Sequence, residues 1–113
     1  MTPKATSRWE KKRTKETRNV ENALKKAGFQ QADAYRYNSA SIRVRVIDPR
    51  FMGKTVEQRD AMVEPHLAKL PERTQADIMS LLTLAPEEIA SADVSSTAFF
   101  QNAEFEDPSP SLL

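Results

Sequence analysis

The sequence has no cysteine among its 113 residues. Disulfide bonds, thiolate catalysis and metal clusters held by cysteines of this chain alone are therefore excluded. The chain also lacks any apolar run close to the roughly 20 residues that a membrane-spanning helix needs. Its basic N-terminal segment has no apolar stretch behind it, so it does not have the pattern of a secretory signal. Together these absences predict a cytoplasmic protein without a membrane segment.

Glycine and histidine are scarce as well, with two glycines and a single histidine, His66. A Walker-type phosphate loop needs two glycines five residues apart, but the residue five before Gly53 is Asp48. Asp60 and Glu64 fall on one face of a predicted helix, yet no histidine or cysteine accompanies them. We therefore predict no catalytic residues, no metal ligands and no cofactor, and a protein that is not an enzyme.

Charge is divided unevenly along the chain. Residues 1–15 carry six Lys or Arg and one Glu, a net charge of +5, whereas residues 86–113 carry six Asp or Glu and no Lys or Arg. We predict a disordered basic arm over 1–15 and a disordered acidic tail over 93–113, flanking a folded domain over 16–92. The arm can contact phosphates or an acidic partner, and the tail can shield the arm by intramolecular attraction. Trp9 can dock on the domain or stack on a nucleic-acid base, and we expect it to dock or to be exposed.

The middle of the chain shows alternating strand and helix patterns. Residues 41–48 are the clearest strand, since β-branched side chains occupy one face and Arg43 and Arg45 the other. The apolar run 78–84 is short enough to favour a buried strand over a helix. The predicted elements are a helix over 17–26, a hairpin of strands 33–38 and 41–48, a helix from Val56 that kinks or breaks at Pro65, a strand over 78–84, and a short helix from Pro86.

The stretch from Phe51 to Thr55 joins the second predicted strand to the next helix. Phe51 is expected to plug the core and Gly53 to take a positive φ before the helix. Thr55 is expected to cap the helix together with Gln58. An exposed helix N-terminus beside Lys54 also attracts anions, so phosphate contact is an alternative interpretation of the same turn.

Basic side chains are predicted to gather on the outer face of the hairpin. Arg36, Arg43 and Arg45 are expected on this face, with Arg50 and Lys54 at its end. One interpretation is a solvated face whose arginine stems cover apolar surface. The alternative is a nucleic-acid surface that makes sequence-independent phosphate contacts, to which the arm adds Lys11, Lys12 and Arg13. A GxxG loop, which would make RNA binding specific, is absent.

The order of elements and three stretches of sequence resemble the BolA-like family. The stretches are IRVRVIDPRFMGKT, VEQRDAMV and LTLAPEE, and the similarity covers roughly residues 16–90. Its most specific element is Phe51-x-Gly53-Lys54-Thr55. The resemblance implies an α/β fold of two layers in the order α-β-β-α-β-α, related to the type II KH arrangement, with a three-stranded sheet and helices on one face. It also implies stress-linked regulation, DNA binding in some members, and partnership with monothiol glutaredoxins through a shared iron–sulfur cluster.

One position departs from the family's pattern. The family's cluster-ligand histidine falls on Asp60, and a carboxylate is a hard oxygen ligand that poorly replaces imidazole on a thiolate-bridged iron cluster. We therefore expect a non-enzymatic, cytoplasmic BolA-like domain that acts through a protein partner. The resemblance implies a glutaredoxin-like partner, here without a shared cluster, and an unidentified regulator is the other candidate. We expect a monomer or weak homodimer. Nucleic-acid binding through the arm and the arginine face is the alternative.

Overall fold

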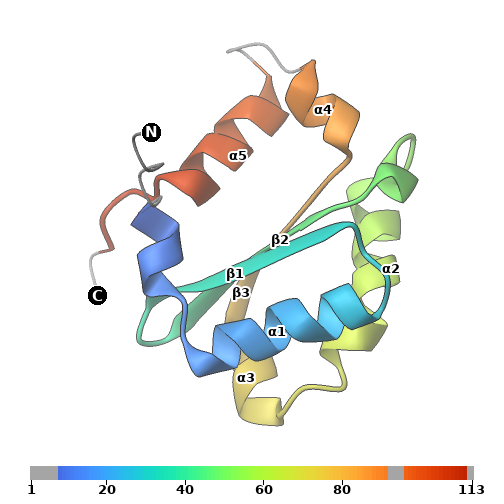
Figure 1. Ribbon diagram of the computed structural model, residues 1–113. Coiled ribbons are helices and arrows are strands. Elements are labelled where there is room, and N and C mark those ends of the chain that lie inside the picture. The colour runs from blue at the N-terminus through green and yellow to red at the C-terminus, as the bar shows by residue number, and fades with distance from the viewer. Residues whose placement is uncertain (1–7, 92–95, 112–113) are drawn as a thin grey trace, which may run out of the picture.

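A three-stranded sheet with helices on both of its faces forms the centre of the protein (Figure 1). The computed structural model describes residues 8–91 and 96–111. In chain order the elements are the short 3₁₀ helix η1 (Arg8–Lys12), α1 (Lys15–Lys26), β1 (Gln31–Asn38), β2 (Ser41–Ile47), η2 (Pro49–Phe51), α2 (Val56–Leu67), α3 (Glu72–Asp77), β3 (Ile78–Leu84), α4 (Pro86–Ala90) and α5 (Thr97–Glu106). The predicted class, a mixed α/β fold with a small three-stranded sheet, is confirmed.

The strands lie in the order β1-β2-β3. β1 and β2 form the predicted antiparallel hairpin, and β3 pairs with β2 in parallel. The apolar run 78–84 is therefore a strand, as its length predicted. Only its C-terminal end is fully buried, while Met79 and Ser80 are exposed, because β3 lies at the border of the sheet.

One face of the sheet packs on α1 and α2. Val20 and Leu24 of α1 and Val63 of α2 are fully buried against this face. On the sheet side the contact is made by alternate residues of β2, such as Val44 and Val46, which have no exposed surface. The apolar side chains that alternate along β2 and those at helical spacing on α1 therefore pack together in one core.

The helix boundaries follow their capping residues. Thr14 caps α1 by accepting a hydrogen bond from the Thr17 N–H at 3.3 Å, so the helix begins two residues earlier than predicted. Gly28 has φ +97, which lets the chain turn at the end of α1. Of the kink or break predicted at Pro65, the break does not occur, because α2 continues through Pro65 to residue 67. Pro65 and Ala61, whose carbonyl loses its partner, are both exposed, so water can bind this carbonyl.

The other face of the sheet is covered by η1 and α5, so the prediction of helices on one face is wrong. Trp9, Tyr35 and Phe105 form a second buried cluster on this face, with ring centroids 5.9, 5.4 and 4.9 Å apart. In Figure 1 α1 and α5 lie on opposite sides of the sheet. The fold therefore has three layers in the described part of the chain.

Both terminal segments were predicted to be disordered, but each contains an ordered helix. Residues 8–12 form η1 and residues 97–106 form α5. Each segment places a large aromatic side chain in the buried cluster, and such burial offsets the entropy lost when a segment becomes ordered. Residues 1–7, 92–95 and 112–113, which belong mostly to the predicted arm and tail, lie outside the described residues.

Candidate binding site

The turn over residues 51–55 holds the start of α2 against the sheet. Phe51 is fully buried in the core. Gly53 has φ +78. Thr55 Oγ1 accepts a hydrogen bond from the Gln58 N–H at 3.1 Å, and the Gln58 side chain accepts one from the Thr55 N–H at 2.9 Å. The plug, the glycine hinge and the capping box therefore have the positions that the sequence predicted.

Arg59 ties this turn to the end of the sheet. Its side chain is largely buried, and its guanidinium donates to the carbonyls of Lys54 and Thr83, each at 3.0 Å. It also donates to both carboxylate oxygens of Glu88, at 2.7 and 3.1 Å, and this pairing lowers the pKa of Glu88. One side chain thus joins the three stretches that resemble the BolA-like family, although the sequence analysis assigned it no role.

The predicted cluster of arginines on one face of the hairpin does not form. Arg36 pairs with Ile42 and lies on the α1 face, whereas Arg43 and Arg45 lie on the opposite face. The prediction of one arginine face assumed that Tyr37 pairs near Ile42, but Ile42 pairs with Arg36 and the register shifts between Arg36 and Asn38. A difference of one residue in register exchanges the two faces of a strand. Arg36 donates instead to Glu16 of α1 at 2.7 Å.

The two arginines on the other face are paired with acidic residues. Arg45 is only 2% exposed and forms ion pairs with Asp33 at 2.7 Å and with Glu106 at 2.8 Å. Arg43 pairs with Glu104 at 3.2 Å. Glu104 and Glu106 both belong to α5, so this helix occupies the positions that a phosphate backbone was expected to contact.

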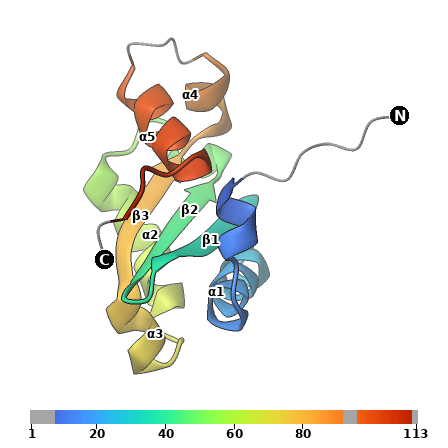
Figure 2. The ribbon, with the colours of Figure 1, turned by 90° about the vertical axis from the view of Figure 1, so that its left-hand side faces the viewer.

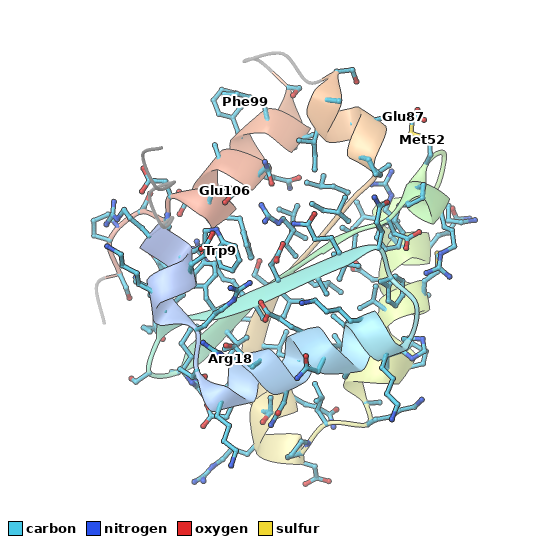
Figure 3. All side chains as sticks on the ribbon, in the orientation of Figure 1. Trp9, Arg18, Met52, Glu87, Phe99 and Glu106 are labelled. Atoms are coloured by element: carbon cyan, nitrogen blue, oxygen red, sulfur yellow. The ribbon has the colours of Figure 1, made fainter. Side chains whose placement is uncertain are left out.

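The described part of the basic arm lies beside α5 (Figure 3). The Trp9 indole N–H donates to Glu106 at 2.7 Å, and Arg8 pairs with Asp107 at 3.0 Å. Arg13 pairs with a carboxylate of α1 at 3.0 Å. The acidic tail therefore contacts the basic arm, which is the intramolecular attraction considered from the sequence.

The other predicted anion contacts lie on separate parts of the surface. Lys11 and Lys54 are exposed, and the Lys12 ammonium lies 5.7 Å from the centre of an aromatic ring. Arg50 pairs with Asp48 at 2.9 Å, and this hydrogen bond lowers the pKa of Asp48. The cations proposed for nucleic-acid contact are therefore dispersed, and several already have partners.

The residues at the family's ligand position do not fit an iron–sulfur cluster. The position holds the carboxylate of Asp60, and the chain has no cysteine. His66 cannot substitute, since its ring packs against Phe29 at 5.7 Å and lines a different cavity from Asp60. Over residues 8–91 and 96–111, no three His, Cys, Asp or Glu side chains are grouped to hold a metal ion. We therefore derive no function from a cluster.

Asp60 itself lacks a hydrogen-bond partner for one oxygen. Its Oδ1 is buried and accepts no hydrogen bond in the described structure. Burial, followed by the nearby charges of Glu64 and Glu57, raises the pKa of Asp60. Asp60 and Glu64 line a groove of about 460 Å³ between α2 and β3, and no Lys or Arg lines it. We call this the acidic groove, and its chemistry favours a cation.

β3 is one of the two outer strands of the sheet, and β1 is the other (Figure 2). Within the described ranges β3 pairs only with β2, so its other edge, called here the free edge, carries no strand. The acidic groove lies on one side of this edge. On the other side a second groove of about 320 Å³ lies against α5, lined in part by Leu82, Phe100 and Phe105, and we call it the apolar groove. Ser80 and Leu81 line both grooves, so the grooves adjoin along the free edge.

β3 has none of the sequence features that usually protect a sheet edge. Residues 78–84 contain no charged side chain and no proline. Met79, which a register shift leaves without a partner on β2, is 69% exposed. Natural edge strands commonly carry lysine or proline, which prevent pairing with another chain. The sequence showed this apolar run, but its place at the border follows only from the order of the strands.

None of the helices in the described ranges has the length and apolar character needed to cross a membrane. No family model matches this chain, and no curated protein or solved structure does either. The evidence for its function is therefore the arrangement of its own residues around the free edge of β3.

Proposed function

We propose that this chain is a non-enzymatic, BolA-like domain that binds an extended segment of a protein partner alongside β3. The observation that carries the proposal is the uncharged free edge of β3 between two grooves. An added strand would supply hydrogen-bond partners for the outward backbone groups of β3, and pockets for its side chains would provide specificity. A partner bound in this way needs no metal and no chemistry from the domain.

The two grooves have the positions that such a strand requires. Successive side chains of a strand point to opposite faces of a sheet. A strand beside β3 would therefore direct alternate side chains into the acidic groove and into the apolar groove. Because Ser80 and Leu81 line both grooves, each groove begins directly at the strand to be paired.

The BolA-like part of the proposal is supported by the roles of the motif residues. Phe51 is buried, Gly53 has a positive φ, and Arg59 links the turn to Glu88 of the LTLAPEE stretch. The proposal includes a cytoplasmic location and admits a glutaredoxin-like protein as one partner. The dispersal of the predicted cations disfavours nucleic acid as the partner, because phosphate binding relies on cations gathered in one patch.

A random peptide library displayed on phage and panned against the full chain tests the proposed function. We expect enriched peptides whose affinity falls by about tenfold or more when Met79 is changed to lysine (Met79→Lys), because a charge on the edge blocks strand pairing. Val56→Lys is the matched control, since Val56 is 61% exposed and lies outside both grooves. Failure to enrich any peptide, or an equal loss of affinity in both variants, would contradict the proposal.

A further inference from the structure

We propose that the partner segment carries lysine or arginine at alternate positions, with apolar residues between them. Its cations would enter the acidic groove, and its apolar side chains would enter the apolar groove. The inference rests on the proposed function and adds to it the chemistry of the partner. Three observations support it: the unpaired carboxylates, the lining of the second groove, and the free edge. The repulsion expected between two copies of the chain is a further argument for a basic segment.

The carboxylates of the acidic groove have no cationic partner in the protein. Neither Asp60 nor Glu64 forms an ion pair within the ranges that the structure describes. The groove contains Asp60, whose Oδ1 is buried without a donor. An ammonium or guanidinium group from a bound segment would supply the opposite charge to the carboxylates of Asp60 and Glu64 that line the groove, and charge-assisted bonds are the stronger kind.

The apolar groove favours a different side chain. Phe100 is 59% exposed beside it, and Leu82 and Phe105 contribute further apolar surface. The two charged residues of its lining, Arg43 and Glu104, pair with each other at 3.2 Å. This groove therefore has apolar surface to bury and no unpaired charge to offer, which suits an aliphatic or aromatic side chain.

A second copy of this chain suits the free edge less well than a basic segment. If two β3 strands paired antiparallel about a twofold axis normal to the sheet, the α2 sides of both copies would lie on the same face. The acidic grooves would then adjoin, and Asp60 and Glu64 of one copy would approach those of the other. Carboxylates brought together from two copies oppose association, whereas the lysine or arginine of a bound segment would neutralise the carboxylates of one copy.

The test compares the peptides that the wild-type chain selects from the phage library with those selected by Asp60→Asn/Glu64→Gln. We expect the wild type to enrich Lys or Arg at every second position, with apolar residues between them. The double variant is expected to lose the basic preference and keep the apolar one. A synthetic wild-type-selected peptide should bind the double variant about tenfold or more weakly, and its binding to the wild type should weaken with added salt.

The outcomes separate this inference from the proposed function. Peptides that bind the free edge without a basic preference, or with one that survives in the double variant, would overturn the inference and leave strand pairing intact. Enrichment of no peptide at all would overturn both. Self-association of the wild type that Met79→Lys abolishes, without peptide binding, would identify a second copy as the occupant and overturn the inference. Thermal unfolding of the double variant verifies that it is folded.

Discussion

Replacing Arg45 with alanine is expected to lower the free energy of unfolding by about 3–5 kcal/mol, the usual cost of breaking a buried ion pair. Arg45 is 2% exposed, and its guanidinium donates to Asp33, Glu106 and Asn102. The Asp33 side chain is 9% exposed, so without Arg45 its carboxylate would lose its closest cation while still largely excluded from water. The two bonds to α5 would be lost as well, which weakens the helix that covers this face. Urea denaturation followed by circular dichroism measures the change.

Two further variants test the cause of that loss. Arg18→Ala removes an exposed arginine on α1 and is expected to change the unfolding free energy by no more than about 0.5 kcal/mol. The double variant Asp33→Asn/Arg45→Met removes both buried charges and should recover part of the stability, because no buried carboxylate is left without its cation and Glu106, whose side chain is 40% exposed, can be solvated. Equal stability of Arg45→Ala and the wild type would show that α5 does not pair with this arginine in solution.

Phe51→Ala is expected to destabilise the fold by about 3–5 kcal/mol through the cavity that it leaves. Phe51 has no exposed surface, and its ring lies 6.0 Å from that of Phe29, so removing it empties the space between sheet and helices. Phe51 is also the first residue of the turn that positions α2 and its acidic residues. The same denaturation measurement gives the unfolding free energy.

Met52→Ala is the matched control for this prediction. Met52 is the next residue in the same turn but is 52% exposed, so its truncation should cost no more than about 0.5 kcal/mol. If the two variants lost equal stability, the turn would contribute to folding through its backbone, and the role of Phe51 as a core plug would be contradicted.

The sequence predicted the elements whose pattern is local. Alternation over residues 41–48 predicted β2 and its buried face, and the spacing of Thr55 and Gln58 predicted the cap of α2. The apolar run 78–84 predicted β3 from length alone. In each case the sequence pattern is short-range, and the intrinsic propensity of the residues agrees with their burial. The predicted element therefore also forms in the folded protein.

What the sequence did not predict depends on contacts between distant segments. α5 is ordered because Phe105 is buried beside Trp9 and Tyr35 and because Glu104 and Glu106 pair with arginines of β2, and the composition of the segment alone does not indicate these contacts. Arg36 was placed on the wrong face because a bulge near the turn shifts the register by one residue. The burial of Arg59 could have been predicted, because Arg59 lies four residues before Val63 and therefore on the same buried face of α2.

The free edge of β3 could not be predicted from the sequence either. Its apolar run was visible, but the edge is open because β3 pairs with β2 in parallel and no described segment follows on its outer side. The acidic groove depends likewise on α2 lying beside β3, which brings Asp60 next to Leu81. The candidate site is thus a product of topology, and among the residues of the acidic groove the sequence had drawn attention to Asp60 and Glu64 alone.

The central claim is that a partner segment pairs with the free edge of β3. Amide hydrogen exchange measured by NMR, with and without a peptide selected by the wild-type chain, tests it most directly. The account predicts slower exchange for outward-facing amides of residues 78–82 when the peptide is bound, with little change in β1. Protection confined to η1, α1 or the Phe51–Thr55 turn, with β3 unchanged, would contradict it.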